Sequence, residues 1–148
     1  MTTPRRGGPG GGTVGTAPRL LIVDDSARFL RAARGLLNRQ GLTVVGVASH
    51  GSDALQQAGA LRPDLILVDI DLSGESGFEL VRRLHQEAGL APAELVLIST
   101  HDPDDFAELI SVSPAGGFLP KADLSADAIL CLLNAGAEEG DHYRSRRC

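Results

Sequence analysis

Short runs of consecutive apolar residues alternate along the chain with longer segments in which apolar residues recur every three or four positions. Runs rich in Leu, Ile and Val are typical of strands that are buried on both faces of a parallel sheet. A spacing of three and four is typical of helices that cover such a sheet. The runs predict five strands, at residues 19–23, 43–47, 64–69, 94–98 and 116–119.

The intervening segments predict five helices, some of which carry signals at their ends. Ser26 fits the N-cap of the first helix, and Gly41 fits the position just after its end. Ser125 fits the N-cap of the last helix, and Asp127 lies in its first turn, where the helix dipole favours an acid. Strands that alternate with helices predict an α/β fold, a doubly wound five-stranded parallel sheet with five helices on its two faces. The helices are expected at residues 27–40, 54–61, 78–89, 106–110 and 126–139.

With 148 residues, the chain is long enough for one domain with a core but too short for two. A hydrophobic content of 43% fits such a globular domain. We expect a disordered Gly/Pro-rich tail at 1–18, the domain at 19–139 and a polar tail at 140–148. A net charge of −5 gives no argument for nucleic-acid binding, and no stretch is long and apolar enough for a membrane. Two cysteines are too few for a disulfide-rich secreted scaffold, so a cytoplasmic location is expected.

Residues that could take part in a chemical reaction lie at, or directly after, the carboxyl ends of the predicted strands. Asp24 and Asp25 follow the first strand, Asp69 ends the third, Ser99 follows the fourth and Lys121 follows the fifth. Because the carboxyl ends of parallel strands share one edge of a doubly wound sheet, these residues should converge. Three carboxylates in one crevice repel one another, and oxygen ligands suit Mg²⁺. A lysine and a hydroxyl suit a phosphoryl group, and Lys121 is the only lysine beside 13 arginines.

These segments, in this order, carry a resemblance to a known family. The matching stretches are LLIVDD (20–25), LILVDI (65–70), LVLIS (95–99) and GFLPK (117–121). The chain resembles a CheY-like response-regulator receiver domain over residues 19–139, close to the receivers of NarL/LuxR-type regulators. The resemblance implies a flavodoxin-like sheet with strand order 2-1-3-4-5.

The resemblance also implies a role for each residue of the group. Asp69 is the phosphoacceptor, which attacks the phosphohistidine of a sensor histidine kinase or phosphotransfer protein and forms an acyl phosphate. Mg²⁺ is bound directly by Asp25 and Asp69, through water by Asp24, and by the backbone carbonyl of Asp71. The protein is then a signalling phosphoacceptor that catalyses only its own phosphotransfer and dephosphorylation.

Three further residues are assigned to switching and readout by the same resemblance. Lys121 pairs with Asp69 before transfer and with the phosphoryl oxygens afterwards. Ser99 is the switch hydroxyl, and Phe118 holds the aromatic switch position. A separate output protein is expected on the fourth helix, fifth strand and fifth helix, and a homodimer is a further candidate. The predicted domain is followed only by residues 140–148, so no DNA-binding output domain is expected within this chain.

The chain departs from the family pattern near the predicted site. Ser73 stands where proline is usual, which predicts a less stiff loop after Asp69. Ala122 stands where many members have a cis proline, and Thr100 stands where a smaller alanine is usual. None of these departures removes a primary role.

Other interpretations of the same residues are open. Taken singly, Asp24 and Asp25 fit a helix-capping pair, and Phe118 fits a core side chain. Asp69, Asp71 and Ser73 also match the DxDx[TS] box of haloacid-dehalogenase-like phosphatases, but those enzymes place that box on their first strand. A pseudo-receiver that only binds partners is disfavoured by the intact aspartate and lysine. A dinucleotide site is disfavoured because acids replace the Gly-rich turn after the first strand.

Overall fold

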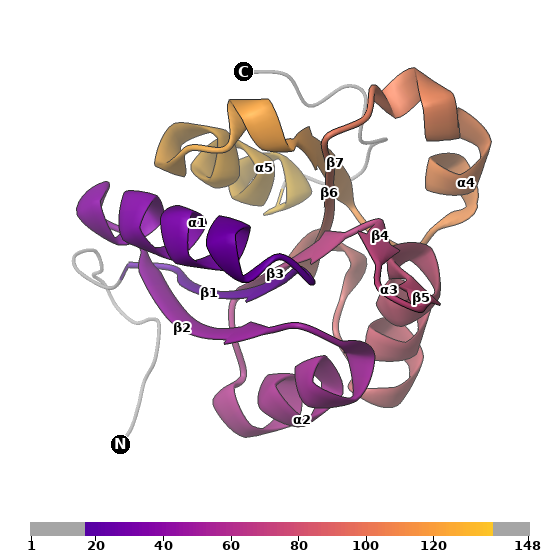
Figure 1. Cartoon of the computed structure of the whole chain (residues 1–148), viewed down its shortest axis with the longest axis horizontal. Coiled ribbons are helices and arrows are strands. Elements are labelled where there is room, and N and C mark those ends of the chain that lie inside the picture. Colours follow the sequence, from indigo (N-terminus) through magenta and orange to yellow (C-terminus); the bar gives the residue numbers. More distant parts are fainter. Residues whose placement is uncertain (1–16, 138–148) are drawn as a thin grey trace.

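A five-stranded parallel sheet forms the centre of the molecule, as Figure 1 shows, in a computed structural model that describes residues 17–137. The spatial order is β2–β1–β3–β6–β7, and every neighbouring pair is parallel. Counted among the strands of this sheet alone, that order is 2-1-3-4-5. The predicted doubly wound fold is therefore confirmed. The strands are β1 (Arg19–Val23), β2 (Thr43–Ala48), β3 (Leu65–Asp69), β6 (Leu95–Ser99) and β7 (Gly117–Pro120).

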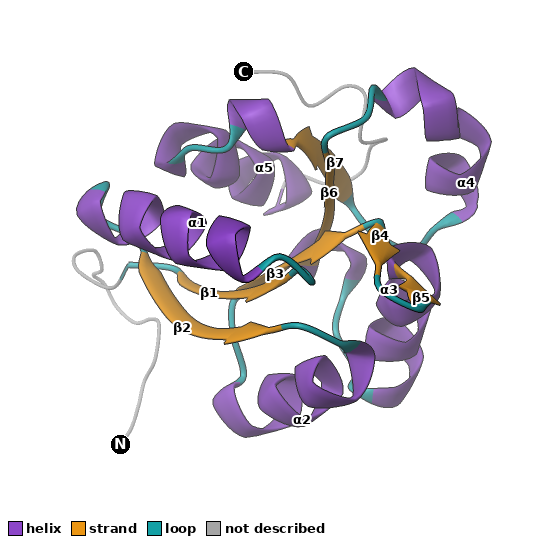
Figure 2. Ribbon diagram, viewed as in Figure 1, coloured by secondary structure: helices purple, strands orange, loops and turns teal. Residues whose placement is uncertain are grey.

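Helices cover both faces of the sheet, as the colouring of Figure 2 makes clear. Successive side chains of a strand point to opposite faces of the sheet. Leu20 therefore belongs to the core cluster beneath α1 and α5, whereas Leu21 belongs to the cluster beneath α2, α3 and α4. Because helices bury both faces of the sheet, the positions between the two ends of each central strand are apolar. The helices are α1 (Ala27–Arg39), α2 (Gly51–Leu61), α3 (Gly77–Glu87), α4 (Ala107–Val112) and α5 (Ala126–Ala137).

The predicted helix ends are confirmed by their hydrogen bonds. Ser26 Oγ accepts from the backbone N–H of Phe29 at 3.1 Å, and Ser125 Oγ accepts from that of Ala128 at 3.1 Å. Gly41 follows α1 with a φ of +98°, a conformation that glycine adopts without strain.

The start of α2 and the loop after β3 differ from the prediction. Residues 71–76 form a small antiparallel hairpin, β4 (Asp71–Leu72) and β5 (Glu75–Ser76), where a plain loop was expected. Gly74 supports the turn with a φ of +77°. The Glu75 carboxylate accepts from the backbone N–H of Gly51 at 2.9 Å, so α2 begins three residues earlier than its apolar spacing indicated.

Between residues 17 and 137, short 3₁₀ helices occupy three connections. Glu94 was expected to open a strand but belongs to η1 (Pro92–Glu94), because the proline favours a turn there. The other two are η2 (Pro103–Phe106) and η3 (Lys121–Asp123). The predicted tails lie mostly outside the described residues. No helix within residues 17–137 combines the length and the apolar content needed to cross a membrane.

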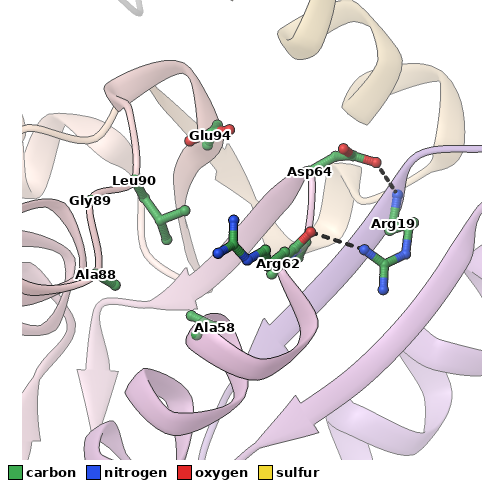
Figure 3. Close-up of a pocket in the computed structure, with 10 residues that line it drawn as sticks. Arg19, Ala58, Arg62, Asp64, Ala88, Gly89, Leu90 and Glu94 are labelled. Carbon is green, nitrogen blue, oxygen red and sulfur yellow. Dashed lines mark hydrogen bonds between the residues drawn. The ribbon is translucent and has the colours of Figure 1, made fainter. Parts of the chain in front are cut away.

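A cavity of about 650 Å³ opens at the amino-terminal edge of the sheet, seen in close-up in Figure 3. Its lining includes Arg19 at the start of β1, Asp64 just before β3 and Glu94 just before β6. Arg19 donates its backbone N–H to Asp64 Oδ2 at 2.8 Å and its Nη1 to the carbonyl of Arg62 at 2.9 Å. The cavity lies at the opposite end of the strands from Asp69, so it is separate from the predicted site.

Candidate functional site

Three carboxylates meet where β1 and β3 end. One oxygen each of Asp24, Asp25 and Asp69 can be chosen so that all three lie within 4.8 Å of one another. Asp24 is fully buried, Asp69 is 6% exposed, and Asp25 is exposed to solvent. The predicted convergence of these acids at one sheet edge is therefore observed.

Strand register places the two buried acids side by side. Val23 of β1 pairs with Val68 of β3, so the residues that follow them, Asp24 and Asp69, lie at adjacent strand ends. Asp24 Oδ1 accepts from the backbone N–H of Ser26 at 2.8 Å. Asp24 thus also supports the turn into α1, as the helix-capping interpretation of this residue suggested.

Lys121 bridges the two buried acids from the end of β7, which β6 separates from β3 in the sheet. Its Nζ lies 2.5 Å from Asp24 Oδ2 and 3.2 Å from Asp69 Oδ2. The same ammonium lies 4.3 Å from the centre of the Phe29 ring, close enough for a cation–π interaction. A compact ammonium can contact two carboxylates and an aromatic face at once, which accounts for a lysine in a chain that otherwise uses arginine.

Burial and charge pairing together set the pKa values of Asp69 and Lys121. Burial raises the pKa of Asp69, and the negative charge of Asp24 raises it further. The backbone N–H of Asp71 and the ammonium of Lys121 lower that pKa but do not cancel the increase. Burial lowers the pKa of Lys121, yet its pairing with Asp24 and Asp69 outweighs burial and leaves that pKa raised. Lys121 therefore stays charged, and Asp69 is a more basic carboxylate than one in water.

The donor set fits a hard divalent cation. Three carboxylates and one ammonium give a formal charge of −3 + 1 = −2, which such a cation would balance. Asp24 Oδ2 is buried without a well-aligned hydrogen bond, although it forms the ion pair with Lys121. Oxygen-only ligands suit Mg²⁺. Of the predicted ligands, Asp71 is exposed and its side chain is not in the cluster, so its predicted role through the backbone carbonyl stays a prediction.

Asp71 contributes to the site through its backbone amide, which donates to Asp69 Oδ1 at 3.2 Å. Because Lys121 contacts Asp69 Oδ2, both oxygens of the Asp69 carboxylate have a donor. The side chain is thereby fixed at the end of β3.

Ser99 and Phe118 lie where the sequence placed them. Ser99 ends β6, is buried, and accepts through Oγ from the backbone N–H of His101 at 2.8 Å. Phe118 on β7 is buried in the same core cluster as Leu97 and Ile110. The core interpretation of Phe118 describes this arrangement, and its switch role stays a prediction.

Gly77 allows α3 to begin directly beneath Asp69. Its backbone N–H donates to the carbonyl of Ile70 at 2.9 Å. A Cβ at this position would collide with the carbonyl oxygen of Asp69 and would lie 2.6 Å from Ile70 Cα and 2.7 Å from Asp69 C. Only glycine permits this approach without moving the backbone that carries Asp69.

Two supporting side chains were not predicted. Ser73 Oγ donates to Asp25 Oδ2 at 2.7 Å, and the Phe29 ring packs against Lys121. Ser73, which stands where the resemblance predicts a proline, was a visible signal, but its partner lies 48 residues away along the chain. Phe29 is indistinguishable in sequence from the core residues of its helix.

Comparison with known proteins agrees with this geometry. Residues 20–130 match the model of the response regulator receiver domain. The chain is 36% identical over 114 residues to a protein-glutamate methylesterase/protein-glutamine glutaminase of Alkalilimnicola ehrlichii, which covers 74% of this chain and 28% of that protein. It is 32% identical over 112 residues to a putative transcriptional regulator of Pseudomonas aeruginosa. That alignment covers 76% of this chain and 53% of the regulator. The chain therefore spans about a quarter to a half of these relatives.

Solved structures give the same result. The signal receiver domain of the putative response regulator NarL from Mycobacterium tuberculosis superposes with a TM-score of 0.64 at 26% identity, covering 84% of this chain and 96% of that one. The family match spans most of the chain, and it includes all the residues that meet at the carboxyl edge of the sheet. The protein belongs to the response regulator receiver domains of two-component signalling.

Proposed function

We propose that the protein receives a phosphoryl group on Asp69 from the phosphohistidine of a sensor histidine kinase or phosphotransfer protein. The observation that carries this proposal is the cluster of Asp69 with Asp24, Asp25 and the single lysine, Lys121. We also infer a signalling role rather than turnover of a separate substrate, and a cytoplasmic location; membership of the receiver family supports both.

The proposed transfer is a displacement at phosphorus. A carboxylate oxygen of Asp69 attacks, the bond between phosphorus and the donor's imidazole nitrogen breaks, and that nitrogen keeps the electron pair. The raised pKa of Asp69 makes its ionised form a stronger nucleophile than an ordinary aspartate. Lys121, now paired with Asp69 and Asp24, would pair with the transferred phosphoryl oxygens.

Mg²⁺ would be held directly by Asp25 and Asp69, through water by Asp24, and by the backbone carbonyl of Asp71. When bound, it supplies positive charge that offsets the phosphoryl oxygens during transfer. Asp25 is the exposed member of the cluster, so it faces the direction from which ion and phosphodonor arrive.

Phosphorylation would be reported through Ser99, Phe118 and the surface of α4, β7 and α5. The Ser99 hydroxyl, whose oxygen now accepts from the His101 N–H, would donate its O–H to a phosphoryl oxygen. That contact would favour a minor conformation of the domain. In residues 17–137, the large apolar side chains that are more than a third exposed lie on α4 and α5: Leu109 (49%), Val112 (79%) and Leu130 (38%). An output protein or a second copy of this chain would cover this surface.

The test is incubation with Mg²⁺ and acetyl phosphate, followed by intact mass measurement. We expect an adduct of about 80 Da, absent in Asp69→Asn and absent when EDTA replaces Mg²⁺. An unmodified wild type would contradict the proposal and favour a pseudo-receiver. Sustained hydrolysis of phosphate monoesters would favour the phosphatase interpretation instead.

A further inference from the structure

The β4–β5 hairpin is attached at two points to loops that lie far from it in the sequence. On one side, Ser73 Oγ donates to Asp25 Oδ2 at 2.7 Å. On the other side, a carboxylate oxygen of Glu75 accepts from the backbone N–H of Gly51 at 2.9 Å. The hairpin therefore joins the loop after β1, which carries Asp25 of the acidic cluster, to the start of α2.

The Ser73 contact acts on the least constrained of the three carboxylates. Asp24 is held by Ser26 and Lys121, and Asp69 by Asp71 and Lys121. Asp25 is exposed, and within residues 17–137 its side chain has the Ser73 hydroxyl as its hydrogen-bond donor. The hydroxyl thus limits the rotamers of an acid that would otherwise move in solvent.

We propose that Ser73 is a positioning residue for Asp25. Through this contact, an ordered hairpin favours the binding of a divalent cation at the acidic cluster, and a bound cation favours the ordered hairpin. This inference rests on the proposed function. An ionised carboxylate has about four lone-pair positions on its two oxygens, so one hydroxyl and one cation can share it. A side chain that is already oriented loses less freedom when the ion binds.

The coupling is reciprocal. If the Ser73 contact favours the cation, the bound cation must favour the ordered hairpin by the same factor. A proline at position 73 would stiffen the loop whether or not an ion is bound, because proline restricts the backbone itself. A serine instead stiffens it through Asp25, so loop order follows the occupancy of the site.

The experiment measures Mg²⁺ binding by calorimetry, without any phosphodonor, for the wild type and four variants. Ser73→Ala removes the hydroxyl, Ser73→Thr keeps it, and Ser73→Pro stiffens the loop without restoring the contact. Ser111→Ala is the matched control, because Ser111 is an exposed serine on α4 that donates to the carbonyl of Glu108. Thermal melts in EDTA establish that each variant is folded.

We expect Ser73→Ala to bind Mg²⁺ about two- to fivefold more weakly, the equivalent of one ordered side chain. Ser73→Pro should be equally weak, whereas Ser73→Thr and Ser111→Ala should match the wild type. In hydrogen exchange, Mg²⁺ should protect residues 70–77 of the wild type more than those of Ser73→Ala.

Two results would overturn this inference alone. Wild-type affinity in Ser73→Ala would show that Asp25 needs no positioning, and wild-type affinity in Ser73→Pro would show that loop stiffness is sufficient. Both leave the proposed phosphoacceptor role intact. A wild type that binds no Mg²⁺ would overturn the inference together with the metal site.

Discussion

Replacing Gly77 by alanine tests how closely α3 supports β3, the strand that carries Asp69. The added Cβ would meet three backbone atoms, the Asp69 carbonyl oxygen, Asp69 C and Ile70 Cα. Backbone atoms cannot rotate away as a flexible side chain can. Either α3 or the end of β3 must therefore move, and Asp69 is the residue that β3 carries into the site.

The expected loss of stability is about 2–3 kcal/mol, the upper part of the range for overpacking in a filled interior. For a domain of this size, each kcal/mol corresponds to about 3–5 °C in Tm, so Tm should fall by about 6–15 °C. A shift of Asp69 by a fraction of an ångström should also slow phosphorylation about tenfold or more, because transfer depends on alignment.

Gly59→Ala is the matched control. Gly59 lies within α2, and a Cβ there would meet nothing within 4 Å. Alanine should leave phosphorylation unchanged and raise stability by about 0.5–1 kcal/mol, because glycine is a poor helix former. Calorimetric melts and rates with acetyl phosphate measure both effects. Ordinary surface substitutions change the free energy of unfolding by up to about 0.5 kcal/mol. If Gly77→Ala changes it by no more than this, the packing argument is refuted.

Three further predictions follow from the charges and the surface. Asp69→Asn should raise the metal-free unfolding free energy at neutral pH, because a raised pKa means that the ionised carboxylate destabilises the fold. That gain should vanish below the ordinary aspartate pKa of 3.8, where the carboxyl is protonated in both the folded and the unfolded protein. It should grow as pH rises through the pKa that Asp69 has in the folded protein. Thermal melts across pH in EDTA measure this gain. Lys121→Met should cost about 2–4 kcal/mol in EDTA, since two buried acids lose their cation, and Mg²⁺ should restore part of it in urea denaturation. Val112→Asp should leave phosphorylation by acetyl phosphate unchanged and weaken output-protein binding at least tenfold in pull-down titrations.

The fold was predictable because the strands are apolar runs and the helices carry their own end signals. Ser26, Gly41 and Ser125 mark helix ends by local chemistry, which a sequence displays directly. The convergence of Asp24, Asp25, Asp69 and Lys121 was predictable for a different reason. Parallel strands force their carboxyl ends to one edge, whatever their separation along the chain.

The rest depended on contacts that no local pattern encodes. The hairpin at residues 71–76 has strands of two residues, too short to show a period. The early start of α2 depends on Glu75, which lies 24 residues from Gly51. Ser73 likewise acts on Asp25 only because the fold brings their loops together. These contacts all belong to the loop after Asp69.

The most direct test of the central claim is chemical identification of the phosphorylated residue. Borohydride reduces an aspartyl phosphate to homoserine, which peptide mapping then locates. After incubation with Mg²⁺ and acetyl phosphate, the account predicts homoserine at position 69 and none at positions 24, 25 or 71. Homoserine at one of those other positions, or phosphate on a serine or histidine, would contradict it.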